Sequence, residues 1–395
     1  MSDTTLDRIL KQCHSFVANP DSNYMDDIFA QKLKAFSNPA FSSEDQKKLC
    51  TYHHKLILTE VIPAYQELAD SLESLRGTGK SSRGLAFFEG GREYYLYLLQ
   101  SQTGTYVPVG QIEKRLSAQL LSDYREISSL LKQNSSLIDR LNQCSGELTL
   151  TPTQMLEKLP ELMKKDFPEL KDATYELRTV HPSMKKFLSP AFYLTPPVDT
   201  RTPNVIYIND SGRTSSLELF GTLAHEGFPG HLYQTVSFAE NNPSDIRYLV
   251  TSSGYVEGWA TYVESYGYEY AASLMNDPDS AKNAVRFAWL NRSMNLCIYS
   301  LIDIGIHYRG WDAARTAVFL KAFGINNAST AAEIYQYIVE TPGNYLKYYW
   351  GYLNFLDLKT VCQKRLGDDF DLKEFHRRIL EIGPVQFPVL EKYMK

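Results

Sequence analysis

The spacing of apolar residues along this chain predicts that it is mostly helical. Between residues 45 and 75, apolar side chains recur every three or four positions, as on the buried face of an amphipathic helix. The same spacing predicts further helices at 110–133, 152–165, 215–240, 245–272, 279–307, 312–322, 329–340 and 344–363. Thr151 and Pro152 suit an N-cap and a first helical turn, and so mark the start of one of them.

Two stretches break the helical pattern. Residues 134–147 are polar and rich in Ser and Asn, which predicts a surface connection. Four prolines lie between residues 188 and 212, where residues 205–208 form a short, mostly β-branched run bounded by turn residues. This run predicts an edge strand or a small hairpin, so the expected fold is mainly α with a small β element.

Composition narrows the class of protein. Apolar side chains make up 43% of the 395 residues and charged ones 22%, the usual balance of a globular protein. The net charge of −5 is spread without a basic block, which argues against nucleic acid or anionic lipid as a partner. No apolar stretch reaches the roughly 18 residues of a membrane span, and residues 1–20 lack the apolar run of a signal peptide. We expect a cytoplasmic protein, or an extracytoplasmic one if an N-terminal leader or domain has been removed.

The cysteines do not indicate a site of their own. There are five, an odd number, and they are scattered without a CxxC pair. Neither a disulfide framework nor a thiolate metal site is therefore indicated, and we expect reduced thiols with a structural role.

The segment HEGFPGH at residues 225–231 carries the candidate chemistry. Neutral imidazoles such as His225 and His231 are suitable zinc ligands. Glu226 lies about 100° further round the helix than His225, so it can face the attacking water rather than the metal. There it would act as a general base, taking the proton of the water and passing one to the leaving amine.

The spacing of the two histidines requires a break in the helix. In the HExxH motif the histidines are four residues apart and share one helical face, but His225 and His231 are six apart. In an ideal helix their side chains would point about 120° apart and could not share an ion. Pro229 and Gly230 allow the turn to bulge or unwind, which would bring His231 back to the same side.

A third ligand is expected downstream. Glu257 stands 26 residues after His231 in the next predicted helix, and a helix hairpin would bring it to the two histidines. Glu264 is seven residues further on and on nearly the same face, so it is the alternative ligand, or a partner that orients a histidine. We favour Glu257. The competing interpretation of the whole pattern is a pair of ordinary helix histidines with surface glutamates.

These motifs resemble a known family. HEGFPGH followed by EGWATYVE is similar to the bacterial family called domain of unknown function 885, candidate zinc metallopeptidases related to gluzincins such as thimet oligopeptidase and angiotensin-converting enzyme. Further similar segments are GGREYY at 90–95, DIGIH at 303–307, and PG at 342–343 with the tyrosines and glycine that follow. The resemblance covers residues 85–390. Typical members have a longer N-terminal helical region, often with a leader, and more often have Gln where this chain has Asn344.

The resemblance implies a multi-helix, gluzincin-like fold with the β element beside the active-site cleft. Residues 1–180 would form one cleft wall and residues 181–395 the catalytic, zinc-binding region. Gluzincins place a tyrosine far downstream of the metal helices to stabilise the oxyanion, which makes Tyr348 the first candidate and His307 the second. A core histidine is the alternative for His307.

Two further residues are candidates for binding the substrate. Arg292 suits a substrate carboxylate, although it could equally pair with a structural acid. Tyr345 is the second candidate.

The function expected from the sequence is hydrolysis of peptide bonds in short peptides, with one zinc ion per chain. Two alternatives stay open: a zinc-dependent amidohydrolase acting on a non-peptide amide, and a catalytically silent, metal-stabilised binding protein. Three protein ligands beside the intact Glu226 leave an open position for water, which favours catalysis, because structural zinc sites close with four protein ligands. The sequence leaves the oligomeric state open.

Overall fold

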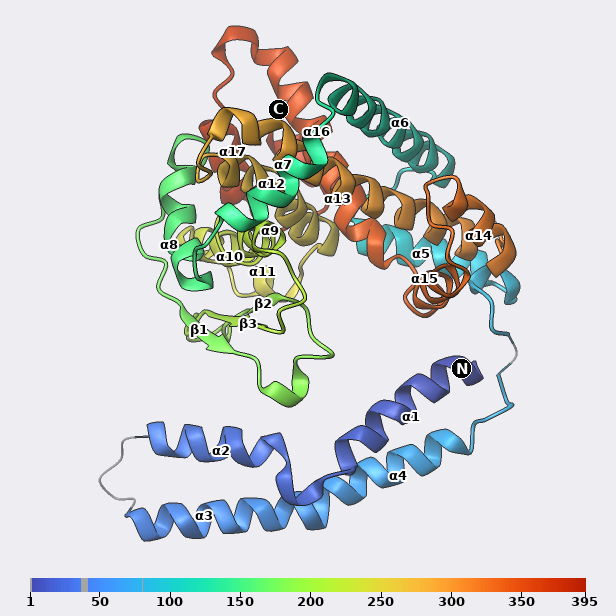
Figure 1. Ribbon diagram of the computed structural model, residues 1–395, viewed down its shortest axis with the longest axis vertical. Coiled ribbons are helices and arrows are strands. Elements are labelled where there is room, and N and C mark those ends of the chain that lie inside the picture. Colours follow the sequence, from blue (N-terminus) through green and yellow to red (C-terminus); the bar gives the residue numbers. More distant parts are fainter. Residues whose placement is uncertain (1, 37–41, 80) are drawn as a thin grey trace. The chain divides into compact units, whose positions relative to one another are not determined.

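Helices form most of the protein in the computed structural model, which describes residues 2–36, 42–79 and 81–395 (Figure 1). The described strands form a single three-stranded sheet, so the predicted mainly α fold with a small β element is confirmed. The chain divides into two units, Met1–Phe88 and Glu89–Lys395. The division lies upstream of the boundary expected after residue 180, because the helices between these two points pack with the helices that carry the candidate site.

The first unit contains two pairs of packed helices. α1 (Asp3–Val17) packs on α4 (Ile62–Glu73). α2 (Tyr24–Ala35) lies against α3 (Ser43–Leu56), and the turn Ile57–Val61 makes α3 and α4 continuous, as predicted for residues 45–75. The buried side chains between α1 and α4 are Leu6, Leu10, Cys13 and Ala69.

The second unit holds the remaining helices. Those before the candidate site are α5 (Gly91–Thr103), α6 (Val109–Gln133), α7 (Leu137–Glu147) and α8 (Pro152–Leu162). Those that follow are α9 (Ser216–Glu226), α10 (His231–Glu240), α11 (Ile246–Leu249), α12 (Ser253–Ala272), α13 (Pro278–His307), α14 (Ala313–Lys321), α15 (Ala328–Glu340), α16 (Asn344–Leu366), α17 (Leu372–Ile382) and α18 (Phe387–Tyr393). Each helix predicted from residue 110 onward is present, and Thr151 caps α8 as expected.

One helix lies where the sequence predicted a connection. α7 occupies most of the polar stretch 134–147. Its buried residues Leu137 and Cys144, together with Leu148 just beyond its end, recur at helical spacing and form an apolar face. The prediction was wrong because burial of this sparse face against α13 outweighs the polar composition.

The sheet contains β1 (Glu176–Thr179), β2 (Ala191–Leu194) and β3 (Val205–Ile208) in the order β1–β3–β2. β3 pairs parallel with β1 and antiparallel with β2, so β2 and β3 form the expected hairpin. β3 itself is the central strand, which fits its apolar, largely buried sequence, and the edge-strand alternative is wrong. β2 forms one edge, beside α9.

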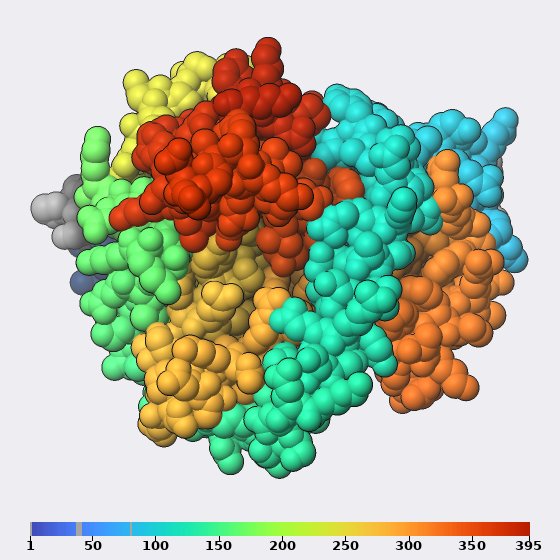
Figure 2. Space-filling view, turned by 90° about the horizontal axis from the view of Figure 1, so that it is seen from above, coloured from blue at the N-terminus to red at the C-terminus, as the bar shows by residue number. Residues whose placement is uncertain are grey.

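α12 lies at the centre of the second unit. It is buried over most of its surface, and it packs against α9, α13 and α16. The space-filling view shows the C-terminal residues (red) and the α6–α7 segment (teal) covering one face, with gold residues from the end of α12 and the start of α13 between them (Figure 2). None of the helices in the described ranges is long and apolar enough to cross a membrane.

Candidate metal centre

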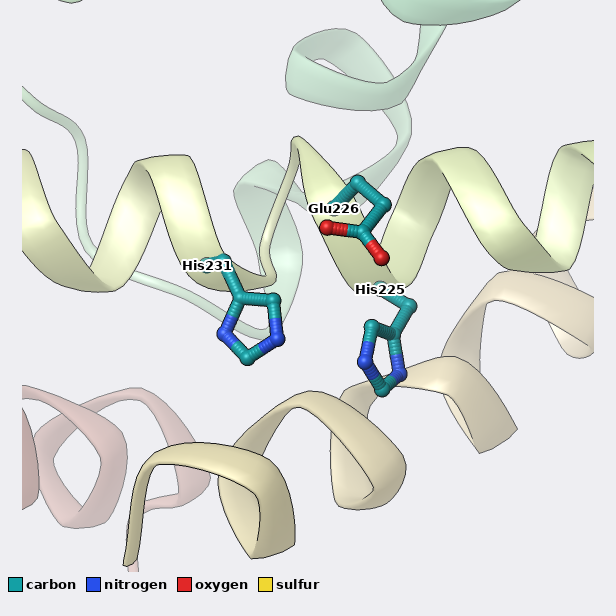
Figure 3. Close-up of side chains that lie close together, drawn as sticks. All are labelled: His225, Glu226 and His231. Atoms are coloured by element: carbon teal, nitrogen blue, oxygen red, sulfur yellow. The ribbon is translucent and has the colours of Figure 1, made fainter. Parts of the chain in front are cut away.

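The predicted break in the metal helix lies between α9 and α10. α9 ends at Glu226, and α10 begins at His231. The intervening turn is tight, because a Cβ atom at Gly230 would lie 1.8 Å from the backbone oxygen of His225. Only glycine fits this close approach. The turn places both imidazole rings on the same side of the chain (Figure 3), so the histidines converge although they are six residues apart.

The two imidazoles meet a carboxylate from α12. Oε2 of Glu257 lies 3.4 Å from Nε2 of His231 and 3.8 Å from Nε2 of His225. The two rings are perpendicular, with their centroids 4.8 Å apart. Three donor atoms from three elements therefore point at one small volume.

These distances fit a zinc ion. Zinc bonds to histidine nitrogen and carboxylate oxygen are about 2.0–2.2 Å, so adjacent ligands of a tetrahedral site are separated by about 3.3–3.6 Å. The carboxylate–imidazole distances of 3.4 and 3.8 Å lie at or near this range. Two neutral nitrogens and one carboxylate are also a common set of protein ligands for catalytic zinc. The residues present therefore fit a zinc ion held by His225, His231 and Glu257.

Glu264 lies on the other side of the His225 ring. Its Oε2 atom is 3.3 Å from Nδ1 of His225, and its Oε1 atom accepts a 2.9 Å hydrogen bond from Nε of Arg292. Burial raises the pKa of Glu264, but Arg292 and His225 outweigh this effect and the net pKa is lowered. The geometry favours Glu264 as the partner that orients His225, and Glu257 as the ligand.

Glu226 is anchored by a contact with the β-sheet. Its Oε2 atom accepts a 2.9 Å hydrogen bond from the backbone N–H of Tyr193 in edge strand β2. The carboxylate also lies close to both histidines, with one potential metal-binding atom from each of the three residues within 4.8 Å of the others (Figure 3). Glu226 is therefore adjacent to the candidate metal position and anchored to the β-sheet.

α16 contributes two residues, one of which the sequence did not indicate. The ring of Tyr348 lies 6.3 Å from that of His225, and its pKa is raised by burial and by the nearby Glu257. Nζ of Lys347 lies 3.6 Å from Oε1 of Glu257 and 5.1 Å from the centroid of the Tyr348 ring. Lys347 therefore pairs with one oxygen of Glu257, and the two histidines lie near the other. Sequence reasoning missed Lys347 because a lysine beside a tyrosine gives no spacing signal.

A cavity of about 900 Å³ opens onto this centre. His225, Glu226 and Tyr348 line it, as do the predicted substrate-binding residues Arg292 and Tyr345. Pocket volumes of roughly 300–1,000 Å³ are usual for small ligands. Five of the predicted site residues therefore line one cavity.

His307 lies elsewhere, in the core. Its ring stacks on that of Tyr95 at 5.5 Å, and its Nε2 atom lies 2.8 Å from the carbonyl oxygen of Ile338. The side chain is fully buried, and burial lowers its pKa to about 4. The structure does not bring His307 to the cavity, which supports the core-histidine alternative.

The segments around Asp303 and Gly343 share one structural role. The buried carboxylate of Asp303 accepts the backbone N–H of Gly343 at 2.8 and 3.0 Å and the hydroxyl of Tyr95 at 2.5 Å. Gly343 is the N-cap of α16, the helix that carries Tyr348. Asp303 therefore fixes the start of that helix relative to α13.

Two glycines set the distance between α12 and α16. A Cβ atom on Gly258 would lie 2.5 Å from the backbone of Gly351, and one on Gly351 would lie 2.1 Å from the backbone oxygen of Gly254. The helices therefore cross in direct backbone contact. This crossing brings Glu257 of α12 beside Lys347 and Tyr348 of α16.

Comparisons with known proteins show the family by one match and the fold by two others. The family model described as "Bacterial protein of unknown function (DUF885)" matches residues 1–394. A candidate lipoprotein from Colwellia psychrerythraea has a similar solved structure, with a TM-score of 0.84 and 22% identity over 100% of this chain and 70% of that one. A candidate lipoprotein of unknown function from Shewanella oneidensis has a TM-score of 0.61 and 17% identity over 92% and 69% of the two chains. The comparison with curated proteins finds no match.

Proposed function

The chain belongs to the DUF885 family of bacterial proteins, and we propose that it is a zinc-dependent peptidase that hydrolyses short peptides. The match confirms the family that its motifs indicate. The observation that carries the proposal is the convergence of Nε2 of His225, Nε2 of His231 and Oε2 of Glu257 beside the separate carboxylate of Glu226. Three ligands with an adjacent non-ligand glutamate are typical of hydrolytic zinc sites.

Each side chain has a role in this mechanism. When bound, zinc would polarise the scissile carbonyl and activate water for attack. Glu226 takes a proton from the attacking water and passes it to the leaving nitrogen. The hydroxyl of Tyr348 donates a hydrogen bond to the oxygen that becomes negatively charged. Glu264 holds His225 so that its Nε2 atom faces the ligand position.

The edge strand supports a gluzincin-like arrangement. Gluzincins place a strand beside the substrate, and here β2 lies beside α9, with Pro190 and Ala191 lining the cavity. The backbone N–H of Tyr193 holds Glu226 at this edge. An extended peptide along β2 would therefore pass the proposed base.

The location of the protein is also a proposal. Both similar solved structures are described as candidate lipoproteins, which favours the extracytoplasmic alternative. The cytoplasmic expectation from the sequence has no further support.

Mass spectrometry of a mixed peptide library tests the proposed function. We expect the zinc-loaded wild type to cleave a subset of peptides, and we expect Glu226→Gln to bind zinc but to be slower by about 10²–10⁴-fold. Glu157→Gln is the matched control, because Glu157 is exposed on α8 and is not among the residues that line the cavity. Equal cleavage by wild type and Glu226→Gln would contradict the mechanism. A zinc-loaded wild type that cleaves no peptide would contradict the proposed substrate, and a panel of non-peptide amides would then follow.

A further inference from the structure

The charges that line the cavity are unevenly distributed. Its carboxylates are Glu218, Glu226 and Glu264. Arg292 is the single lysine or arginine among the described residues that line it. Among the described lining residues, Arg292 is therefore the one permanent positive charge that a bound substrate can contact.

Arg292 is held in position by Glu264 through only one of its nitrogen atoms. A guanidinium has five N–H donors, and the hydrogen bond to Glu264 engages Nε. The Arg292 side chain is 44% exposed, while the carboxylate that holds it is almost fully buried. The two terminal nitrogens of an arginine match the two oxygens of a carboxylate in a bidentate pair. Arg292 is thus a cation that is held through Nε by a buried carboxylate and is partly exposed where it lines the cavity.

This cation lies close to the hydrolytic centre. A single carboxylate group, that of Glu264, separates Arg292 from His225, with contacts of 2.9 and 3.3 Å on its two sides. An extended chain advances about 3.3–3.6 Å per residue. One or two residues of a peptide are enough to span from the region of His225 to the guanidinium.

The neighbouring lining residues suit the end of a peptide. Asn291 and Asn295 stand on α13 beside Arg292, and Asn344 begins α16. Their amide groups both donate and accept hydrogen bonds, as peptide groups do. A short peptide ending in a carboxylate matches this set of one fixed cation and several neutral amides.

We propose that the enzyme binds peptides by their free C-terminal carboxylate on Arg292 and cleaves one or two residues from that end. This inference rests on the proposed function. In the reaction the carbon–nitrogen bond of the scissile peptide breaks. Water gives its oxygen and one proton to the new carboxyl group, and its other proton goes to the released amine.

Matched peptide pairs test the proposal. Each pair shares one sequence and differs only in a C-terminal carboxylate or carboxamide. For the wild type we expect kcat/KM to be 10- to 150-fold higher for the free acid, the range for a hydrogen-bonded charged pair. Arg292→Gln should lose this preference by reducing cleavage of the free acid alone, and Arg292→Lys should keep part of it. Lys282→Gln, which removes an exposed cation on the same helix, should behave as wild type.

Two further measurements keep the outcomes distinct. The zinc content of Arg292→Gln shows whether its loss of the free-acid preference acts through Glu264 and His225. Binding of both peptide forms to the inactive Glu226→Gln variant measures affinity without turnover. Equal cleavage and equal binding of acid and amide by the wild type, with products cut far from the C-terminus, would overturn the proposal but leave the peptidase intact. Absence of any cleavage, with unchanged zinc, would instead overturn the proposed function.

Discussion

Oε2 of Glu264 lies 3.3 Å from Nδ1 of His225, on the side of the ring away from the nitrogen that faces Glu257. The two nitrogens of His225 thus have different carboxylate partners, one from each of two positions on α12. A carboxylate on the second nitrogen of a metal-binding histidine fixes its tautomer and orientation. This arrangement favours Glu257, the residue preferred from the sequence, as the ligand and Glu264 as the group that orients His225.

Removing that partner should weaken zinc binding without abolishing it. Glu264→Ala is expected to lower zinc affinity by about 10- to 100-fold, because His225 loses the group that orients it. Competition with a chelator measures the change. Glu269→Gln, a change further along the same helix, should leave the affinity unaltered. If Glu264→Ala loses zinc completely while Glu257→Ala retains it, the assignment of the two glutamates is reversed.

The tyrosine on α16 should act in the transition state. Tyr348→Phe is expected to lower kcat by about 10²–10³-fold and to change KM little, since the lost hydrogen bond is made to the charge that develops during the reaction. Steady-state kinetics on one cleaved peptide would show this. The exposed Tyr97→Phe serves as the control. A rise in KM at constant kcat would mean that Tyr348 binds substrate instead.

The close contact of α12 and α16 at Gly258 and Gly351 predicts that two similar substitutions differ widely in their effect on stability. Gly351→Ala should lower the free energy of unfolding by about 1–3 kcal/mol, because its Cβ would lie 2.1 Å from the backbone oxygen of Gly254. Gly110→Ala in α6 meets no atom within 4 Å and should be neutral or stabilising by up to about 1 kcal/mol. Urea denaturation measures both. Equal stability of the two variants would show that α12 and α16 can separate at little cost.

Much of this arrangement followed from the sequence, and the failures have physical reasons. The convergence of His225, His231 and Glu257 could be predicted from the residue types, the proline–glycine pair and the helix spacing. The helix α7 was missed because its apolar face is sparse and gains its stability from packing on α13.

Tertiary packing also determines the positions of two residues that could not be placed from the sequence. His307 lies in an apolar helix in either interpretation, and only packing against Tyr95 places it in the core. Lys347 could not be found at all, because its contact with Glu257 depends on how α16 crosses α12.

A buried histidine away from the metal centre predicts acid sensitivity. His376 is fully buried against the ring of Phe167 at 4.2 Å, and burial lowers its pKa from 6.5 to about 3. Below pH 6.5, His376 therefore binds a proton in the unfolded chain but not in the folded chain. Its contribution to the free energy of unfolding is complete above pH 6.5 and is lost as the pH falls towards 3. Between pH 7 and 5 this loss amounts to about 2 kcal/mol.

Substitution of His376 isolates its contribution to the pH dependence of stability. Between pH 7 and 5, the free energy of unfolding should fall by about 2 kcal/mol less in His376→Gln than in the wild type. This holds even if the variant is less stable than the wild type at both pH values. Denaturant unfolding at the two pH values gives the comparison. An identical pH dependence in both proteins would show that folding does not lower the pKa of His376.

The amount of zinc bound per chain, measured by elemental analysis after dialysis, tests the metal centre most directly. We expect about one zinc ion in the wild type and in Glu226→Gln, and close to none in His231→Ala and Glu257→Ala. A wild type that binds no zinc, or a Glu257→Ala variant that retains one ion, would contradict the proposed set of ligands.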